Sequence, residues 1–396
     1  MSHLIPLGYR MSGVHAGIKR NVTREDCSLV VSDFPAVAAG MYTQNLVFAA
    51  PVALDRARTP GTGFRVVAIN SGNANACTGE RGLADAARMA ELGAAVVGAS
   101  GEQGLVLSTG IIGEFLPLAK VEHGIKLCAD ILGNDQESLE LAARGMMTTD
   151  TTHKLASAAI TTPAGEVRIC GMAKGAAMIA PNMGTMLGLV LCDASITPEL
   201  AQETLRTAVE ATFNCVSVDG HTSTNDTVLL LCNGASGVTI DAATKAEFQK
   251  ALTEVCESLA RQIPADGEGT THVIEIHVTG CADMVAARQL AKCVADSVLV
   301  KCAVHGADPN WGRIVSAAGY AGVPFDPNKV DLHLNGFQLY KQGVPQPFDA
   351  DLVSSSIRDE RDTKILLTFG EGEAELKYWT ADLTAEYVRL NADYHT

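Results

Sequence analysis

The chain has 396 residues, of which 47% are hydrophobic and 19% charged, a balance typical of globular proteins with a large core. A formal net charge of −15, without any run of Lys and Arg, argues against binding to a nucleic acid or to an anionic membrane. No apolar run reaches the roughly 20 residues of a membrane helix, and the first residues lack a signal-peptide pattern. We therefore expect a soluble, cytoplasmic protein of two or three domains, or one large domain.

The cysteines and histidines do not form a recognisable metal site. There are 11 Cys and no C-x-x-C pair, and Cys170, Cys192, Cys232, Cys293 and Cys302 lie in apolar runs. This pattern predicts buried, reduced thiols rather than disulfides or a zinc site. His272 and His277 are five residues apart on an alternating segment, so they point to opposite faces and cannot both bind one metal.

The first half of the chain alternates between strand and helix periods. A hairpin is expected around a Pro-Ala-Gly turn, and the continuous apolar run at 186–192 predicts a strand buried on both faces. In chain order we predict strands at 65–70 and 105–107, separated by a helix at 83–97, then a helix at 136–145, the hairpin strands 156–160 and 166–170, and the strand 186–192.

The second half repeats this mixture. Thr197 and Pro198 predict the start of a helix, and Asn335-Gly336 predicts a type I′ hairpin turn between 330–334 and 337–340. The other expected elements are helices at 248–263 and 282–297, strands at 272–279 and 298–304, and a last hairpin of 365–369 with 374–379. The fold class is therefore α/β or α+β in layers, with sheets sandwiched by helices.

Seven clusters are unusually dense in Asn, Asp, Gly, Thr and Ser. They cover 70–79, 107–114, 147–154, 174–187, 217–227, 266–269 and 306–314. Small polar residues beside strands let backbone N–H groups converge on a ligand, as in an oxyanion site. Tight turns with positive φ are the alternative for any one cluster, but seven in one chain favour a binding or catalytic site.

Thr185 stands out in the fourth cluster because it begins a buried apolar strand. A threonine hydroxyl is a weak nucleophile without a base, and one solution is the threonine's own α-amine, released by cutting the preceding peptide bond. Gly184 leaves little bulk to hinder attack on its own carbonyl. From these residues alone, a purely structural threonine remains the alternative.

The ordered motifs NSGNANACTG, STGIIGE, TTDT, KGAAMIAPNMGTML, STNDT, DGEG and DPNWGRI resemble those of the ornithine acetyltransferase family of arginine biosynthesis, also called glutamate N-acetyltransferase. The resemblance spans essentially the whole chain. It implies the self-cleaving N-terminal-Thr acyltransferase fold, with an α chain of residues 1–184 and a β chain of residues 185–396. The two chains would form one catalytic unit, and two α and two β chains would assemble. An acetyl group would pass from N-acetylornithine to the threonine and then to glutamate.

Residue by residue, the resemblance implies that Thr185 is the nucleophile and that the cut lies between Gly184 and Thr185. Thr109 and Gly110 match the pair that stabilises the oxyanion. Among the matched residues, Lys174 supplies one cation and Glu268 one anion, and such a pair would suit a zwitterionic amino acid. The implied substrate-binding residues, besides Thr185 itself, are Thr151, Lys174, Glu268, Asn391 and Thr396.

Transfer from an amide donor needs no metal and no bound cofactor, although a bifunctional enzyme would use acetyl-CoA as a second acetyl donor. Two alternatives stay open. One is a self-cleaving Thr or Ser aminopeptidase or amidase, in which water takes the acyl group. The other is an uncleaved protein that only binds amino acids.

Overall fold

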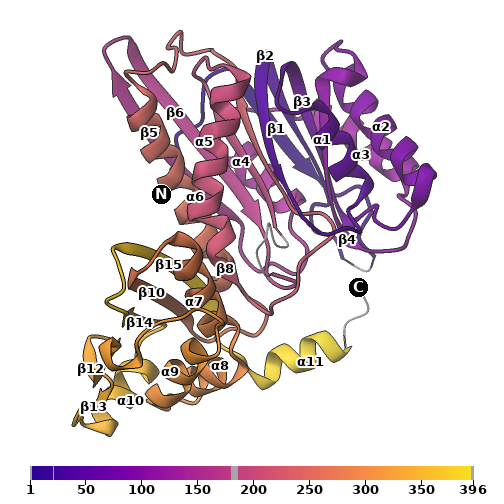
Figure 1. The fold of residues 1–396 in the computed structure, drawn as a ribbon. Helices are drawn as coiled ribbons and strands as arrows, with labels where there is room; N and C mark the ends of the chain where they lie inside the picture. The colour runs from indigo at the N-terminus through magenta and orange to yellow at the C-terminus, as the bar shows by residue number, and fades with distance from the viewer. Residues whose placement is uncertain (1, 21, 180–185, 394–396) are drawn as a thin grey trace.

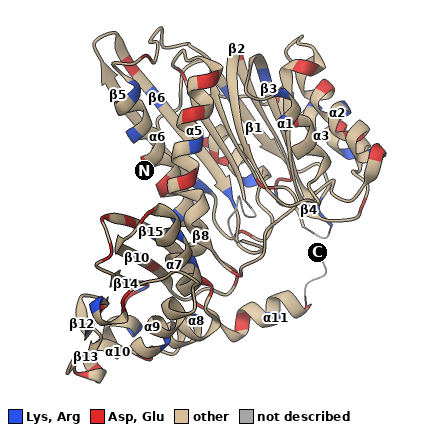
Figure 2. Cartoon of the chain, in the orientation of Figure 1, with Lys and Arg blue, Asp and Glu red and all other residues tan. Residues whose placement is uncertain are grey.

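The computed structural model describes residues 2–20, 22–179 and 186–393. These residues form two units, each built on one mixed sheet (Figure 1). Acidic and basic positions are interspersed over the helices and loops of both units (Figure 2). None of the described helices is long and apolar enough to cross a membrane.

The sheet of the first unit has the strand order β4-β3-β2-β9-β7-β6-β5, with β1 also paired to β2. Its strands are β1 (Tyr9–Val14), β2 (Cys27–Tyr42), β3 (Gly61–Asn73), β4 (Gly104–Ile111), β5 (Lys154–Thr162), β6 (Gly165–Lys174), β7 (Leu187–Cys192) and β9 (Thr227–Cys232). The register of β2 against β3 shifts between Val31 and Ala36. The sheet bends there, so that β3 and β4 share one core cluster with β7 and β9.

Helices cover the outer faces of this folded sheet. Helix α1 (Ala50–Arg58) packs on β4, and α2 (Gly79–Ala95) packs on β3 and β4. Helices α3 (Leu118–Asp130) and α4 (Gln136–Gly145) both pack on β1 and β2. Helix α5 (Pro198–Ala211) packs on β2 and β9, and α6 (Lys245–Ala265) packs on β5 and β6. Leu189 of β7 faces the core between the two halves of the sheet, whereas Val190 faces the core that contains α5 and α6. The predicted layered α/β arrangement and the burial of this strand on both faces are confirmed.

The second unit has the strand order β13-β12-β11-β14-β10-β15-β8. Its strands are β8 (Val216–Ser217), β10 (Val273–Cys281), β11 (Asp331–Leu334), β12 (Phe337–Lys341), β13 (Val344–Pro345), β14 (Asp362–Thr368) and β15 (Ala374–Ala381), and its helices are α7 (Met284–Asp296), α8 (Val298–His305), α9 (Trp311–Gly319), α10 (Ala350–Arg358) and α11 (Ala385–Asp393). Helix α6 contacts β5 and β6 as well as β15 and β8, so it joins the two units.

Local signals in the sequence placed several elements correctly. The Thr197 side chain accepts the Leu200 N–H and caps α5 as expected. Asn335 and Gly336 have φ of 48° and 87°, as a type I′ turn requires. The apolar stripe predicted for 248–263 is the buried face of α6.

Three expectations were wrong. Residues 298–304 form helix α8 instead of a strand, with the Ser297 side chain accepting the Val300 N–H at its start. The segment packs beside α7 and α9. The segments 365–369 and 374–379 are not a hairpin, because β10 lies between β14 and β15 and pairs with both. Cys302 is exposed and Cys293 only partly buried, although every described cysteine is free.

Candidate active site

Several neighbouring strands of the first unit begin or end at the same end of the sheet. Lys154 at the start of β5 pairs with Ala173, and Lys174 at the end of β6 pairs with Leu187 at the start of β7. Leu187 also pairs with Thr227 at the start of β9. The chain therefore enters β7 between Lys174 and the first residue of β9.

Met186, the residue after the predicted nucleophile, is held by a buried carboxyl group. Its N–H donates to Asp226 Oδ1 at 2.9 Å, and its carbonyl accepts the Thr227 N–H at 3.1 Å. Asp226 is fully buried, and within the described ranges its Oδ2 has no hydrogen-bond partner. Burial raises the pKa of Asp226 well above its ordinary value, and the Met186 N–H and the charge of Lys174 only partly oppose this. The predicted residues Gly184, Thr185 and Thr396 lie outside the described residues.

The predicted oxyanion pair lies at the carboxyl end of β4. Thr109 is 5% exposed. Gly110 has a φ of +132°, and a Cβ at this position would lie 2.3 Å from the carbonyl carbon of Gly72. Since no side chain fits there, only glycine allows β4 to approach β3 this closely at its end.

The loop before β9 makes hydrogen bonds to both the end of β4 and the start of β7. Asn225 Nδ2 donates to the carbonyl oxygens of Ser108 at 2.8 Å and Ala74 at 2.7 Å. The next residue, Asp226, holds Met186. The residue before Thr109 and the residue after Thr185 are therefore bound by consecutive residues of the same loop, which brings the predicted oxyanion pair to the entrance of β7.

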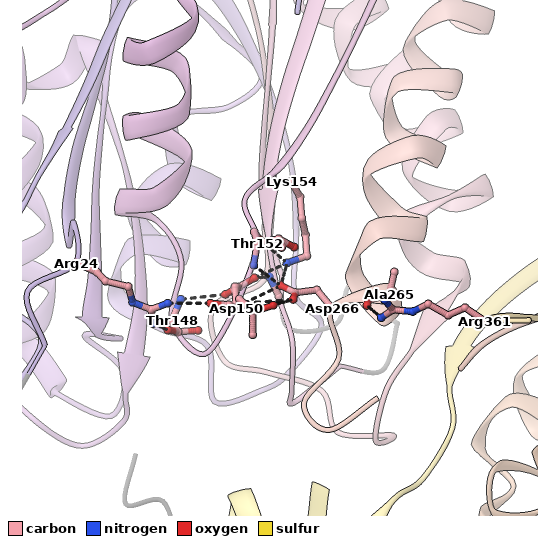
Figure 3. Close-up of polar contacts among 10 residues, drawn as sticks. Arg24, Thr148, Asp150, Thr152, Lys154, Ala265, Asp266 and Arg361 are labelled. Carbon is pink, nitrogen blue, oxygen red and sulfur yellow. Dashed lines mark hydrogen bonds and ion pairs between the residues drawn. The ribbon is translucent and has the colours of Figure 1, made fainter. Parts of the chain in front are cut away.

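Figure 3 shows a network of charged groups in which Lys154 lies between Asp150 and Asp266. The predicted substrate residue Thr151 is exposed and bonds to this network. Lys154 Nζ, in a side chain that is 1% exposed, lies 2.7 Å from both Asp150 Oδ1 and Asp266 Oδ2. Thr151 donates its N–H to Asp266 Oδ2 at 3.0 Å and also its hydroxyl to Asp266 Oδ1. Arg24 donates to the Asp150 carbonyl at 3.0 Å. The network thus ties the loop before β5 to the residue that follows α6.

The charges of this network extend to Lys174. Burial by itself raises the pKa of Asp150, but the charges of Lys154 and Lys174, with hydrogen bonds from Lys154 and the Gly175 N–H, outweigh burial and lower the pKa to about 2. Burial lowers the pKa of Lys174, and the nearby carboxyl groups of Asp150, Asp226 and Glu268 oppose this shift. Lys174 is therefore a desolvated amine at the entrance of β7, surrounded by acidic groups.

Two predicted substrate residues from distant parts of the chain meet beside Lys174. The Glu268 N–H donates to the Ala176 carbonyl at 3.0 Å, so this residue lies next to the segment that follows β6. Glu268 Oε2 accepts a 2.8 Å hydrogen bond from Asn391 Nδ2 of α11, although the two residues are 123 positions apart. The described candidates from both units thus converge on one region.

The residues that organise this region were not singled out from the sequence. Each belongs to a cluster that was recognised in the sequence, and three of the four are aspartates. Because they act on backbone N–H groups and on a buried lysine, only their positions in the fold reveal them. These residues are Asp150 in TTDT, Asp226 in STNDT and Asp266 in DGEG, with Lys154, which pairs with Asp150 and Asp266. Across the described ranges, no group of three or more His, Cys, Asp or Glu could hold a metal ion.

Comparison with known proteins shows the family to which the chain belongs. Residues 10–396 match the model of the ArgJ family. The chain is 46% identical to the arginine biosynthesis bifunctional protein ArgJ of Rhodopirellula baltica, over 100% of this chain and 97% of that protein. It is 44% identical to the protein of the same name from Symbiobacterium thermophilum, over 99% of this chain and 98% of that protein. A crystal structure of ArgJ from Bacillus halodurans is 38% identical, with a TM-score of 0.49, and covers 51% of this chain and 96% of that one. A match of the family model over nearly the whole length shows that the chain belongs to the ArgJ family.

Proposed function

We propose that this protein is an N-acetyltransferase of arginine biosynthesis that moves an acetyl group from N-acetylornithine to glutamate through an acetyl-Thr185 intermediate. The products are ornithine and N-acetylglutamate. Its full-length relatives are named bifunctional ArgJ proteins, which supports a second activity that makes N-acetylglutamate from acetyl-CoA. No metal or bound cofactor takes part in the proposed transfer.

In the proposed mechanism, the Thr185 hydroxyl first attacks the Gly184 carbonyl and displaces the amide nitrogen, which becomes the free α-amine of Thr185. Water then hydrolyses the resulting ester and separates the two fragments. The α-amine takes the proton of the Thr185 hydroxyl as its oxygen attacks the acetamide carbonyl. The Thr109 hydroxyl and the Gly110 N–H stabilise the oxyanion of the tetrahedral intermediate. Ornithine leaves as its α-amine accepts the proton, and the amine of glutamate then attacks the acetyl-enzyme.

One observation carries this proposal: the entrance of β7, one residue after Thr185, lies where Asp226, the end of β4 and Lys174 meet. A reacting group at that point is within reach of a cation for the substrate carboxylate and of Glu268 for its ammonium. Strands β7 and β9 follow Thr185 in the sequence but lie between β2 and β6 of the same sheet. This interleaving supports two fragments, 1–184 and 185–396, that stay together after cleavage. We further propose that two α and two β chains assemble and that the enzyme is cytoplasmic.

The decisive experiment measures acetyl transfer from N-acetylornithine to labelled glutamate in the absence of CoA. We expect labelled N-acetylglutamate and ornithine in equal amounts. Acetate in place of N-acetylglutamate would identify a hydrolase. If neither acetate nor N-acetylglutamate formed, the protein would be one that only binds amino acids. A parallel assay with acetyl-CoA as the donor decides whether the enzyme is bifunctional.

Replacing Thr109 by valine is expected to lower kcat by roughly 10²- to 10³-fold with little change in KM. A donor aimed at charge that develops in the transition state acts on the chemical step, and losing one such donor costs about 2.7–4 kcal/mol. Steady-state kinetics with N-acetylornithine give both constants. The matched control is Thr207→Val, since among the described residues the Thr207 hydroxyl bonds only to the Glu203 carbonyl of its own helix. A raised KM with an unchanged kcat would assign Thr109 to binding instead.

Glu268→Gln is expected to weaken transfer from N-acetylornithine by about 30-fold or more, the typical loss when one partner of a desolvated charge pair is removed. N-acetylnorvaline lacks the δ-ammonium, so its transfer rate should change little. Kinetics with both donors in wild type and variant form a double cycle, with the exposed Glu254→Gln as the control. Equal losses for the two donors would show that Glu268 supports the structure rather than the ammonium.

A further inference from the structure

Helix α11 carries Asn391 but has no hydrophobic anchor. The helix projects from the second unit (Figure 1), and none of its nine residues is buried. A helix this short gains little stability by itself, and most helices are held by packing of an apolar face. The position of α11 must therefore depend on its polar contacts.

Two side chains of α11 bond to other elements of the described structure. Asn391 Nδ2 donates to Glu268 Oε2 at 2.8 Å, and the Tyr387 hydroxyl donates to Asp219 Oδ2 at 3.2 Å. Asn391 Nδ2 also donates to the Tyr387 carbonyl at 3.0 Å. The two contacts lie one turn apart on the same helix, so a displacement at Tyr387 also displaces Asn391.

The Asp219 carboxylate also accepts two hydrogen bonds from a backbone turn. Its Oδ2 accepts the Met178 N–H at 2.6 Å, and its Oδ1 accepts the Ile179 N–H at 2.9 Å. Met178 has a φ of +59°, a backbone conformation that is costly for a residue with a side chain and persists only where contacts enforce it. Ile179 is the last described residue before the segment that contains Thr185. The carboxylate of Asp219 therefore fixes the turn from which the chain continues to the predicted cleavage site.

We infer that Asp219 and Tyr387 form a positioning link between the turn at 178–179 and the substrate residues Glu268 and Asn391. Asp219 holds the turn, and the Tyr387 hydroxyl aligns α11 with it. Neither residue touches the reacting atoms in this account, so both are positioning residues. The inference rests on the proposed function, because it assigns the link a role in self-cleavage and in binding of the acetyl donor.

The two residues should have separable effects. Tyr387→Phe removes one hydroxyl and leaves the contacts of Asp219 with the turn intact. We expect it to raise KM for N-acetylornithine by about 10-fold, the order expected for one hydrogen bond to a charged group, with kcat and self-cleavage unchanged. Asp219→Asn replaces an acceptor oxygen by an NH₂ group that cannot accept from the backbone. We expect it to slow self-cleavage as well as raise KM.

The test combines intact mass at timed intervals after synthesis with transfer kinetics of the mature enzyme. Arg389→Ala is the matched control on α11 and should behave as wild type. Within the part of the chain that the structure describes, Arg389 pairs only with Glu386 and Asp393 of its own helix. In combination with Asn391→Ala, Tyr387→Phe should add little to the rise in KM, because the hydroxyl acts through Asn391.

If the wild-type enzyme is active, two results from the variants would overturn the proposed link. One is a wild-type KM in Tyr387→Phe, and the other is equally slow cleavage in Tyr387→Phe and Asp219→Asn, which would indicate a general folding defect. Failure of the proposed function has a different signature, because wild type itself would remain unbroken and transfer no acetyl group. That result would also overturn the inference that rests on it.

Discussion

Alanine in place of Thr185 is expected to leave one unbroken chain of 41.5 kDa and to abolish acetyl transfer. The variant lacks both the oxygen that attacks the Gly184 carbonyl and the oxygen that carries the acetyl group, so cleavage and turnover fail together. Loss of the nucleophile in a serine protease lowers kcat by roughly 10⁶-fold, and we expect a loss of that order. Intact mass and the transfer assay measure the two effects on the same sample.

Wild type is the positive control for this prediction. It should give two fragments, and the second should begin with the sequence Thr-Met-Leu-Gly. Thr185→Ser keeps the hydroxyl and is expected to retain cleavage. An unbroken wild-type chain that transfers acetyl groups would show that Thr185 does not act through a freed amine. Cleavage in Thr185→Ala would place the cut elsewhere.

Lys154→Met is expected to lower the free energy of unfolding by about 3–5 kcal/mol, the cost of leaving buried charges unpaired. Methionine has a similar length, so the packing changes little, but Asp150 and Asp266 would face each other without the cation that now lies 2.7 Å from each. Urea denaturation followed by circular dichroism measures the loss. Since Asp266 also binds Thr151, the variant should bind N-acetylornithine more weakly as well.

Lys245→Met is the matched control, because Lys245 also lies 2.7 Å from a carboxylate, that of Glu203, but both side chains are exposed. An exposed pair of this kind contributes at most about 1 kcal/mol. Equal losses in the two variants would contradict a stabilising role for the buried network.

The contribution of the network should also depend on pH. The pKa of Asp150 is lowered to about 2, so the unfolded chain binds its proton more readily than the folded protein does. The stabilisation is then fully present above the ordinary pKa of about 4 and is lost as the pH falls towards 2. We expect the difference in unfolding free energy between wild type and Lys154→Met to shrink over that range.

The sequence by itself determined the elements whose cause is local. The stripe on α6 follows from a 3.6-residue period that places apolar side chains on one face. The apolar run of β7 required burial on both faces, and Asn335-Gly336 could adopt the positive φ that a tight hairpin needs. The motifs also determined which residues to consider as a site, because the clusters combine small size with hydrogen-bonding groups.

Only the tertiary structure decided which segments meet. Residues 298–304 have an apolar pattern that suits a strand or a helix, and the packing of α8 beside α7 and α9 decided for the helix. Strand β10 separates β14 from β15, which no pattern within those two strands could reveal. The meeting of Glu268 with Asn391, and the approach of Asp226 to the residue after Thr185, join segments from different elements. Such contacts depend on how the sheets bend and pack, and pattern or propensity along the chain describes only each element by itself.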